Sequence, residues 1–238
     1  MTLPLLAAAL IAWSVRCPAG GDELRTIVQE QCLPNWQSSR NPAPCVSIDA
    51  ETGPEPAFAL LHDRKGGAHF LLIPTRTVRG IDAHEVLAPG APNYFAAAWR
   101  GRAALQVSTG RGIPRTAVGM AINPRRSRSQ EQLHIHIECL RAGLYRGLQQ
   151  AADDLRDTWS SVRIDGADYR ALRVLGAELG AANPFALVAQ GVPGEMNDYT
   201  LLVAGMQFRD GPGFAVLVQT EGVPAGELLL DSSCAVTP

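Results

Sequence analysis

A strict alternation of apolar and polar residues over positions 133–139 is the feature that most constrains the fold of this chain. In a β-strand, successive side chains point to opposite faces, so the two sets would lie on opposite sides of one sheet. The apolar set is Leu133, Ile135 and Ile137, and the polar set is His134, His136 and Glu138. The pattern predicts a strand that packs its apolar face under other elements and directs two imidazoles into one common space.

Composition excludes several classes of protein. The chain has 238 residues, of which 46% are hydrophobic and 18% are charged, so it can bury a core and is not intrinsically disordered. A net charge of −2 argues against a nucleic-acid binder that works by bulk attraction to phosphates. No apolar run in residues 21–238 is long enough to span a bilayer, which excludes a polytopic membrane protein.

Hydrophobic periodicity predicts an α+β fold, with a mostly antiparallel sheet and helices packed on it. We expect strands at residues 57–61, 69–73, 117–123, 133–139, 169–175, 198–203 and 214–219. We expect helices at residues 21–35, 93–106 and 144–159 and a short one from residue 183, with Pro34 ending the first. The order strand–strand–helix–strand–strand can be read twice along the chain. The part after about residue 160 therefore either extends the sheet or forms a degenerate second half, although residue identity shows no duplication.

The N-terminus has a different character from the rest of the chain. Residues 3–15 are apolar except for Ser14. This run is short for a membrane span and typical of the apolar core of a secretory signal. We therefore expect residues 1–20 to form a signal peptide or an N-terminal membrane anchor, followed by one domain over residues 21–238. A buried N-terminal helix is the remaining alternative.

Cysteine usage is consistent with export. Without Cys17, four cysteines remain, and an even number in an exported chain indicates two disulfides. Three pairings are open. In the one that we expect, Cys32–Cys45 closes a short proline-rich loop and Cys139–Cys234 ties the C-terminal region to the middle of the chain. Four buried thiols are the alternative.

The segment before the predicted histidine strand favours phosphate chemistry. Residues 124–131 form a basic turn that contains Arg125, Arg126 and Arg128, and arginines beside imidazoles suit an anion such as phosphate. A neutral imidazole can attack phosphorus, and a backbone carbonyl on its other nitrogen would set its tautomer. Asn123, Ser129 and Gln130 are further donors that could hold the phosphate or the end of the strand.

A His-x-His pair on a strand is also a common pair of metal ligands. A zinc site needs three or four ligands, and the nearby candidates have no diagnostic spacing: Glu138, His84, His69 and His62. The arginines of the turn would also repel a cation. We therefore expect no metal and no cofactor, and we expect His62, His69 and His84 to be surface or loop residues. Glu138 could simply lie beyond the site at the end of the strand.

The chain resembles the histidine-triad superfamily of nucleotide hydrolases and transferases, and more narrowly the bacterial CDP-diacylglycerol pyrophosphatase family. The segments that carry the resemblance are residues 30–35, 41–45, 71–75, 92–95, 121–123 and 129–139, with Cys234. The resemblance implies that His134 is the nucleophile and His136 the last histidine of the triad. Gln132 stands at the first triad position, which departs from the pattern of three histidines.

The same resemblance suggests roles for further residues. Asn123 and Ser129 match polar positions that hold the phosphate and the leaving group, and Thr75 matches the end of a strand near the nucleotide. Arg126 and Arg128 could clamp the diphosphate, or they could belong to a solvated basic turn. Gln130 and Gln132 complete the expected substrate-binding set. The aromatic residues Tyr94, Phe95 and Trp99 are expected in the core.

The implied reaction is metal-independent hydrolysis of the diphosphate of CDP-diacylglycerol to CMP and phosphatidate, through a covalent histidine–CMP intermediate. The implied partners are the liponucleotide and a membrane surface, on the periplasmic face of the inner membrane or in the periplasm. The protein would be a monomer with internal pseudo-symmetry or a homodimer. A histidine-coordinated periplasmic metalloprotein and a non-catalytic nucleotide- or lipid-binding module remain as alternatives.

Overall fold

The computed structural model describes residues 21–49, 58–220 and 225–237. The signal peptide or anchor that we expect over residues 1–20 lies outside this range. Within it, no helix has the length and apolar character needed to cross a bilayer.

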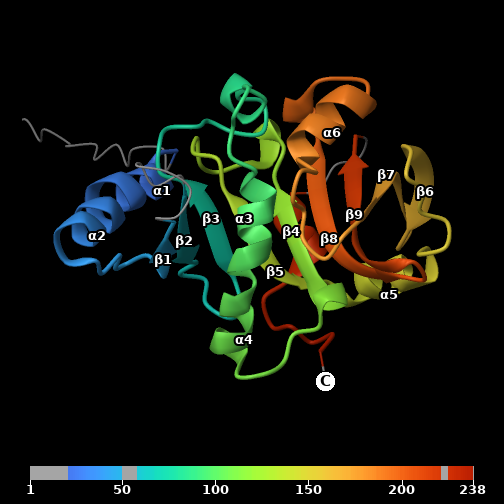
Figure 1. Cartoon of the computed structure of the whole chain (residues 1–238), viewed down its shortest axis with the longest axis horizontal. Coiled ribbons are helices and arrows are strands. Elements are labelled where there is room, and N and C mark those ends of the chain that lie inside the picture. Colours follow the sequence, from blue (N-terminus) through green and yellow to red (C-terminus); the bar gives the residue numbers. More distant parts are fainter. Residues whose placement is uncertain (1–20, 50–57, 221–224, 238) are drawn as a thin grey trace, which may run out of the picture.

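Across the described ranges, one sheet of ten strands runs through the molecule (Figure 1). Its order is β1-β2-β3-β5-β4-β8-β9-β7-β6, with β10 paired to β5, and its neighbouring strands are antiparallel. The strands are β1 Ser47–Ile48, β2 Phe58–His62, β3 Phe70–Pro74, β4 Val118–Ile122, β5 Ile135–Leu140, β6 Ser160–Ile164, β7 Ala167–Leu175, β8 Thr200–Phe208, β9 Gly211–Gln219 and β10 Leu230–Asp231. The mostly antiparallel α+β fold is confirmed. Strands β1, β6 and β10 were not predicted, because two are only two residues long and β6 lacks a buried alternation.

The helices are α1 Glu23–Thr26, α2 Leu33–Ser39, α3 Tyr94–Gly101, α4 Ala103–Thr109, α5 Ala142–Gln150 and α6 Pro184–Gly191. The prediction that Pro34 ends the first helix is wrong. A π-helical segment, Ile27–Cys32, leads directly into α2, and Pro34 lies in the first turn of α2, so the chain stays helical past the proline. The helix expected over residues 144–159 also ends early, at Gln150.

The two halves of the sheet repeat one order of strands. The first half is β2-β3-β5-β4, the second is β6-β7-β9-β8, and they meet at the antiparallel pair of β4 and β8. In each half a helix, α3 or α6, follows the second strand. An internal duplication would produce this order, and it stays a prediction.

The two faces of the sheet are covered differently. On one face, α3 and α6 bury the aromatic residues Phe95, Trp99 and Phe185, and the ring of Trp99 meets Phe214 of β9 edge to face at 4.8 Å. The expected core positions of Tyr94, Phe95 and Trp99 are therefore confirmed. Packing of this kind holds the central strands in one position.

The opposite face carries two separate apolar clusters. The α1–α2 segment packs Leu24 and Val28 over Leu71 of β3, whereas α5 packs Leu144 over Ala121 of β4. Strand β5 lies between β3 and β4, and His136 pairs with Leu71 on one side and Ala121 on the other. The polar face of β5 therefore lies between the two clusters.

Both expected disulfides are present. Cys32–Cys45 ties the helical segment to the start of β1, and Cys139–Cys234 ties β5 to the C-terminal region. The alternative of four free thiols is thus wrong. Both bridges hold elements that border the polar face of β5.

Candidate active site

Strand β5, with His134 directly before it, presents its polar residues as the alternation predicts. Ile135 and Ile137 lie in the core below α3, while His134, His136 and Glu138 lie on the opposite face. All three polar residues are buried, with exposed fractions of 8%, 4% and 4%. Burial of three titratable groups on one strand is costly unless they have partners, and such groups often mark functional sites.

A pocket of about 320 Å³ opens at this face. Five of the predicted site residues line it together: His134, His136, Asn123, Ser129 and Gln130. The helical segment supplies an apolar wall with Leu24 and Ile27, and the backbone N–H of Leu24 donates to Gln130 Oε1 at 3.2 Å. The pocket thus has a polar floor on β5 and an apolar wall on the N-terminal helix.

His134 has the tautomer that a nucleophile needs. Its Nδ1 lies 2.8 Å from the carbonyl oxygen of Gln132, so this nitrogen carries the proton and donates it. The other nitrogen, Nε2, then carries the lone pair. Burial lowers the pKa of His134 below that of an ordinary histidine, although the bond to Gln132 opposes this effect. The imidazole is therefore neutral near pH 7.

His136 is joined to a third histidine. Its Nδ1 lies 3.0 Å from Nε2 of His69, and its ring stands edge-on to His134 with centroids 4.9 Å apart. Burial, followed by the neighbouring imidazoles, lowers the pKa of His136 well below the ordinary value. Its Nε2 is buried and has no hydrogen-bond partner among the described residues. This nitrogen is available to a group bound in the pocket.

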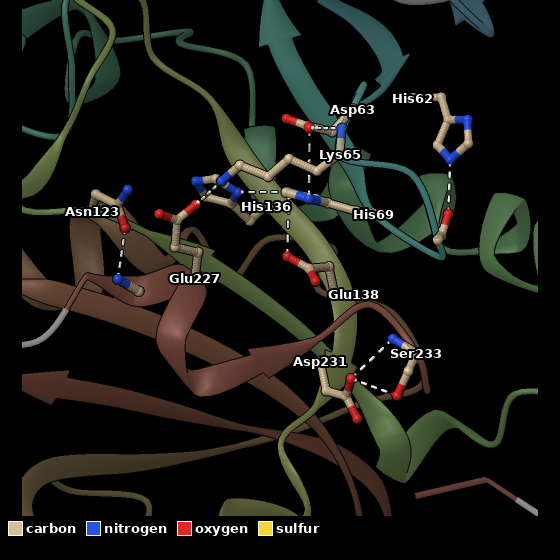
Figure 2. A network of polar contacts seen from close by, with 12 residues as sticks. His62, Asp63, Lys65, His69, Asn123, His136, Glu138, Glu227, Asp231 and Ser233 are labelled. Carbon is tan, nitrogen blue, oxygen red and sulfur yellow. Dashed lines mark hydrogen bonds and ion pairs between the residues drawn. The ribbon is translucent and has the colours of Figure 1, made fainter. Parts of the chain in front are cut away.

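The expectation that His69 is a surface or loop residue is wrong. It is 3% exposed and lies between His136, Glu138 and Asp63, at 3.0, 3.3 and 4.0 Å (Figure 2). Burial lowers its pKa. The alternation of the 69–73 segment places His69 on the same face as Leu71, but only the pairing of β3 with β5 brings it to His136. His62, in contrast, is exposed and contacts the carbonyl of Gly67.

Glu138 is part of the same cluster, so it does not lie beyond the site. Burial, reinforced by the charge of Glu227, raises the pKa of Glu138 to about 8. His69, His136 and Glu138 have potential ligand atoms within 4.8 Å of one another, so they are the described residues that could hold a metal ion. His62 and His84 do not join this set. The two imidazole nitrogens face each other at 3.0 Å, a hydrogen-bond distance, so they can share a proton.

Asn123 is oriented by the backbone. Its Oδ1 accepts a hydrogen bond from the N–H of Gly226 at 2.6 Å (Figure 2). The Nδ2 group is therefore the part of the side chain that can donate to a ligand in the pocket. A neutral donor in this position suits a phosphate oxygen.

Two other predicted substrate-binding residues do not line this pocket. The side chain of Gln132 donates to the carbonyls of Pro74 and Arg76 and accepts from the N–H of Val78. It thus holds the chain after β3 and does not face the pocket. Thr75 is buried in that same segment, and its carbonyl accepts a hydrogen bond from Gln29.

The arginines of the basic turn also lie away from the pocket lining. Arg128 forms ion pairs with Asp82 at 2.9 Å and Glu131 at 3.1 Å, so carboxylates already compensate its charge. Arg126 is exposed on a 3₁₀ turn, Arg125–Ser127. Neither arginine lines the pocket of about 320 Å³, although Arg128 lines a smaller cavity beside Asn123 and His134, and the clamp stays a prediction.

The cations at the pocket come from the turn between β2 and β3, which contains none of the predicted site residues. Arg64 and Lys65 line the pocket, and they pair with Glu23 and Glu227. The sequence shows a charged turn at residues 63–65, but it does not show that the turn reaches over β5, because that depends on the position of β2 and β3 in the sheet.

Comparison with known proteins shows the family of this chain. Residues 19–238 match the family model described as CDP-diacylglycerol pyrophosphatase. The chain belongs to the CDP-diacylglycerol pyrophosphatase family. The CDP-diacylglycerol pyrophosphatase of Yersinia pestis is 34% identical over 248 aligned positions, which cover all of this chain and 93% of that relative. The resemblance noted in the sequence is therefore confirmed at the level of this family.

Proposed function

We propose that this protein hydrolyses the diphosphate of CDP-diacylglycerol to CMP and phosphatidate through a covalent intermediate on His134. Membership of the CDP-diacylglycerol pyrophosphatase family supports the substrate and the reaction. The observation that carries the mechanism is the bond from His134 Nδ1 to the carbonyl of Gln132, which leaves an unprotonated Nε2 on a residue that lines the pocket.

The reaction has two displacements at one phosphorus. His134 Nε2 attacks the phosphorus next to cytidine, the bond to the bridging oxygen breaks, and phosphatidate leaves. Water then attacks the same phosphorus, the P–N bond breaks with its electron pair returning to Nε2, and CMP is released. His136 Nε2 and Asn123 Nδ2 are donors for the phosphate oxygens, and they act most strongly in a site that is shielded from water.

The proposed reaction needs no metal ion. The attacking imidazole is a neutral nucleophile, so no metal is required to generate one. Lys65 and the uncharged donors of the pocket supply the interactions with phosphate oxygens.

The lipid part of the substrate fits a membrane-facing enzyme. A pocket of about 320 Å³ lies at the lower end of the range for small-molecule sites, so it suits the nucleotide end better than two acyl chains. The apolar wall at Leu24 and Ile27 directly follows the predicted signal peptide or anchor.

We place the protein at the periplasmic face of the inner membrane or in the periplasm, and its two disulfides accord with an oxidising compartment. The repeated strand order favours a monomer with internal pseudo-symmetry over a homodimer.

A product assay on CDP-diacylglycerol, with and without EDTA, tests the proposal. We expect CMP and phosphatidate in equal amounts and rates that EDTA leaves unchanged. Activity that EDTA abolishes and zinc restores would support the metalloprotein alternative. Tight binding of the liponucleotide without any product would support a binding module.

Asn123 offers a substitution that separates catalysis from folding. Asn123→Asp keeps an oxygen that accepts the hydrogen bond from Gly226, but it replaces the Nδ2 donor with negative charge. We expect kcat/KM to fall by about a hundredfold, since a lost hydrogen bond to a charged group costs about 1.5–3 kcal/mol and repulsion adds to it. The melting temperature should stay close to that of the wild type. Unchanged kinetics would remove Asn123 from the phosphate site.

A further inference from the structure

Glu138 lies behind the reacting groups and does not line the pocket. Its Oε1 is 3.3 Å from Nε2 of His69, and the same Nε2 is 3.0 Å from Nδ1 of His136 (Figure 2). One nitrogen of His69 therefore serves two neighbours. Because a ring nitrogen carries at most one proton, the position of that proton determines what both neighbours can do.

The proton on His69 sets the tautomer of His136. If His69 Nε2 carries a proton, it donates to His136 Nδ1, and His136 holds its own proton on Nε2. If His69 Nε2 is bare, His136 must donate from Nδ1, and its Nε2 has no proton to offer. His136 lines the pocket, so only the first arrangement provides an N–H donor to a leaving oxygen.

Glu138 decides between these arrangements. The carboxylate of Glu138 stabilises a proton on His69 Nε2, and Asp63 lies 4.0 Å from His69 Nδ1 on the other side of the ring. Together they oppose the lowering of the His69 pKa by burial, and they favour a ring with an N–H on each side when the shared proton is on His69. Without the carboxyl group of Glu138, His69 would keep its proton on the side of Asp63.

The groups around Glu138 favour retention of a proton by the pair. The facing charges come from several elements: Asp63 and Lys65 of the β2–β3 turn, His69 before β3, Glu227 of the 3₁₀ helix Gly226–Leu229 and Asp231 of β10. Among these described groups that act on Glu138, Lys65 is the only permanent cation, and it forms an ion pair with Glu227. In this surplus of carboxylates, a proton shared by Glu138 and His69 reduces the repulsion.

We propose that Glu138 and His69 together store one proton behind His136, and that this proton keeps His136 protonated on Nε2, ready to donate to the leaving phosphatidate. The proposal rests on the proposed function and assigns positioning roles to Glu138 and His69. His136 is the group that touches the substrate.

The proton moves in a balanced sequence. As His134 Nε2 bonds to phosphorus and the bridging P–O bond breaks, His136 Nε2–H gives its proton to the leaving oxygen. At the same time, His69 Nε2–H gives its proton to His136 Nδ1, which leaves His69 neutral. When water attacks the intermediate, its proton goes to His136 Nε2, and the proton on Nδ1 returns to His69. The cluster ends each turnover with the proton count with which it began.

The test is the pH dependence of kcat in Glu138→Gln, which keeps the size of the side chain and cannot share a proton. We expect kcat at pH 7 to fall by about tenfold to a hundredfold with KM unchanged, because Glu138 does not line the pocket. Since the pKa of Glu138 is raised to about 8 and the protonated pair is the active form, kcat of the wild type should fall as pH rises through about 8. The variant should lack this decline. Glu178→Gln, at an exposed ion pair with Arg102, is the matched control and should behave as the wild type.

A second measurement determines directly which ring nitrogen of His136 carries the proton. Ring ¹⁵N resonances of His136 should show a proton on Nε2 in the wild type and on Nδ1 in Glu138→Gln. Glu138→Asp, which retains a carboxyl group, should restore part of kcat and the decline of kcat at high pH. If Glu138→Gln does not fold, Glu138→Asp replaces it in the test.

Three results would overturn the proposal: equal pH profiles in wild type and Glu138→Gln, a wild-type His136 protonated on Nδ1, or stoichiometric zinc that binds the wild type and not the variant. Absence of labelled CMP–enzyme in the wild type would instead contradict the proposed function. The two failures are therefore distinguishable.

Discussion

Replacement of His134 by alanine is expected to lower kcat by at least about four orders of magnitude, the scale seen when a nucleophile is removed from a covalent mechanism. The substitution removes the only proposed bond to phosphorus. His136 cannot take its place because, with its Nδ1 accepting from His69, its Nε2 carries a proton and has no lone pair for attack. Substrate labelled on the phosphorus next to cytidine should mark the wild-type protein in a single turnover and leave His134→Ala unmarked.

The matched control is His134→Gly with added imidazole. A free imidazole can occupy the space of the missing ring, so part of the hydrolysis should return without any label on the protein. A His134→Ala protein that keeps its kcat, or that still acquires label, would show that another residue attacks phosphorus.

Removal of the Cys139–Cys234 disulfide should have the largest effect on stability. The bridge spans 95 residues of sequence, whereas Cys32–Cys45 spans 13. In the loop-entropy model, closure of a longer loop removes more freedom from the unfolded chain, and the two bridges contribute about 4–5 and about 3 kcal/mol. Because all four cysteines are buried, alanine is the replacement that avoids a buried hydroxyl.

Denaturant unfolding of the paired variants, Cys139→Ala with Cys234→Ala and Cys32→Ala with Cys45→Ala, checks this order. The first pair should also reduce activity near the unfolding transition, since Cys139 belongs to β5 with the site histidines. The second pair should act mainly on KM, because its bridge holds the helical segment that forms the apolar wall of the pocket. Equal losses of stability in the two pairs would contradict the loop-length argument.

Several features follow from local sequence alone. The alternation at residues 133–139 places His134 and His136 on one face whatever else surrounds the strand, because the period of side chains along a strand is two. The apolar residues of α3 predict a buried helix in the same way, and Asn93 caps it by accepting from the N–H of Ala96. Where a pattern is periodic and its partners are close in sequence, the prediction holds.

The environment of those residues depends on contacts that are distant in sequence. His69 is 67 positions from His136, and only the antiparallel pairing of β3 with β5 makes them neighbours. The sequence favours Arg128 as a phosphate ligand, whereas in the structure Asp82 lies 2.9 Å from its guanidinium. Gln132 likewise bonds to the segment after β3 and not to the pocket.

The sequence by itself determined which imidazoles share a face and which cysteines were available to pair. The tertiary structure alone decided which charges remain for a substrate and which are compensated, and it placed Glu138 behind the histidines as their buried partner. The physical reason is that side-chain direction is a local property of the backbone, whereas burial and ion pairing depend on strands and loops that meet only when the sheet is assembled.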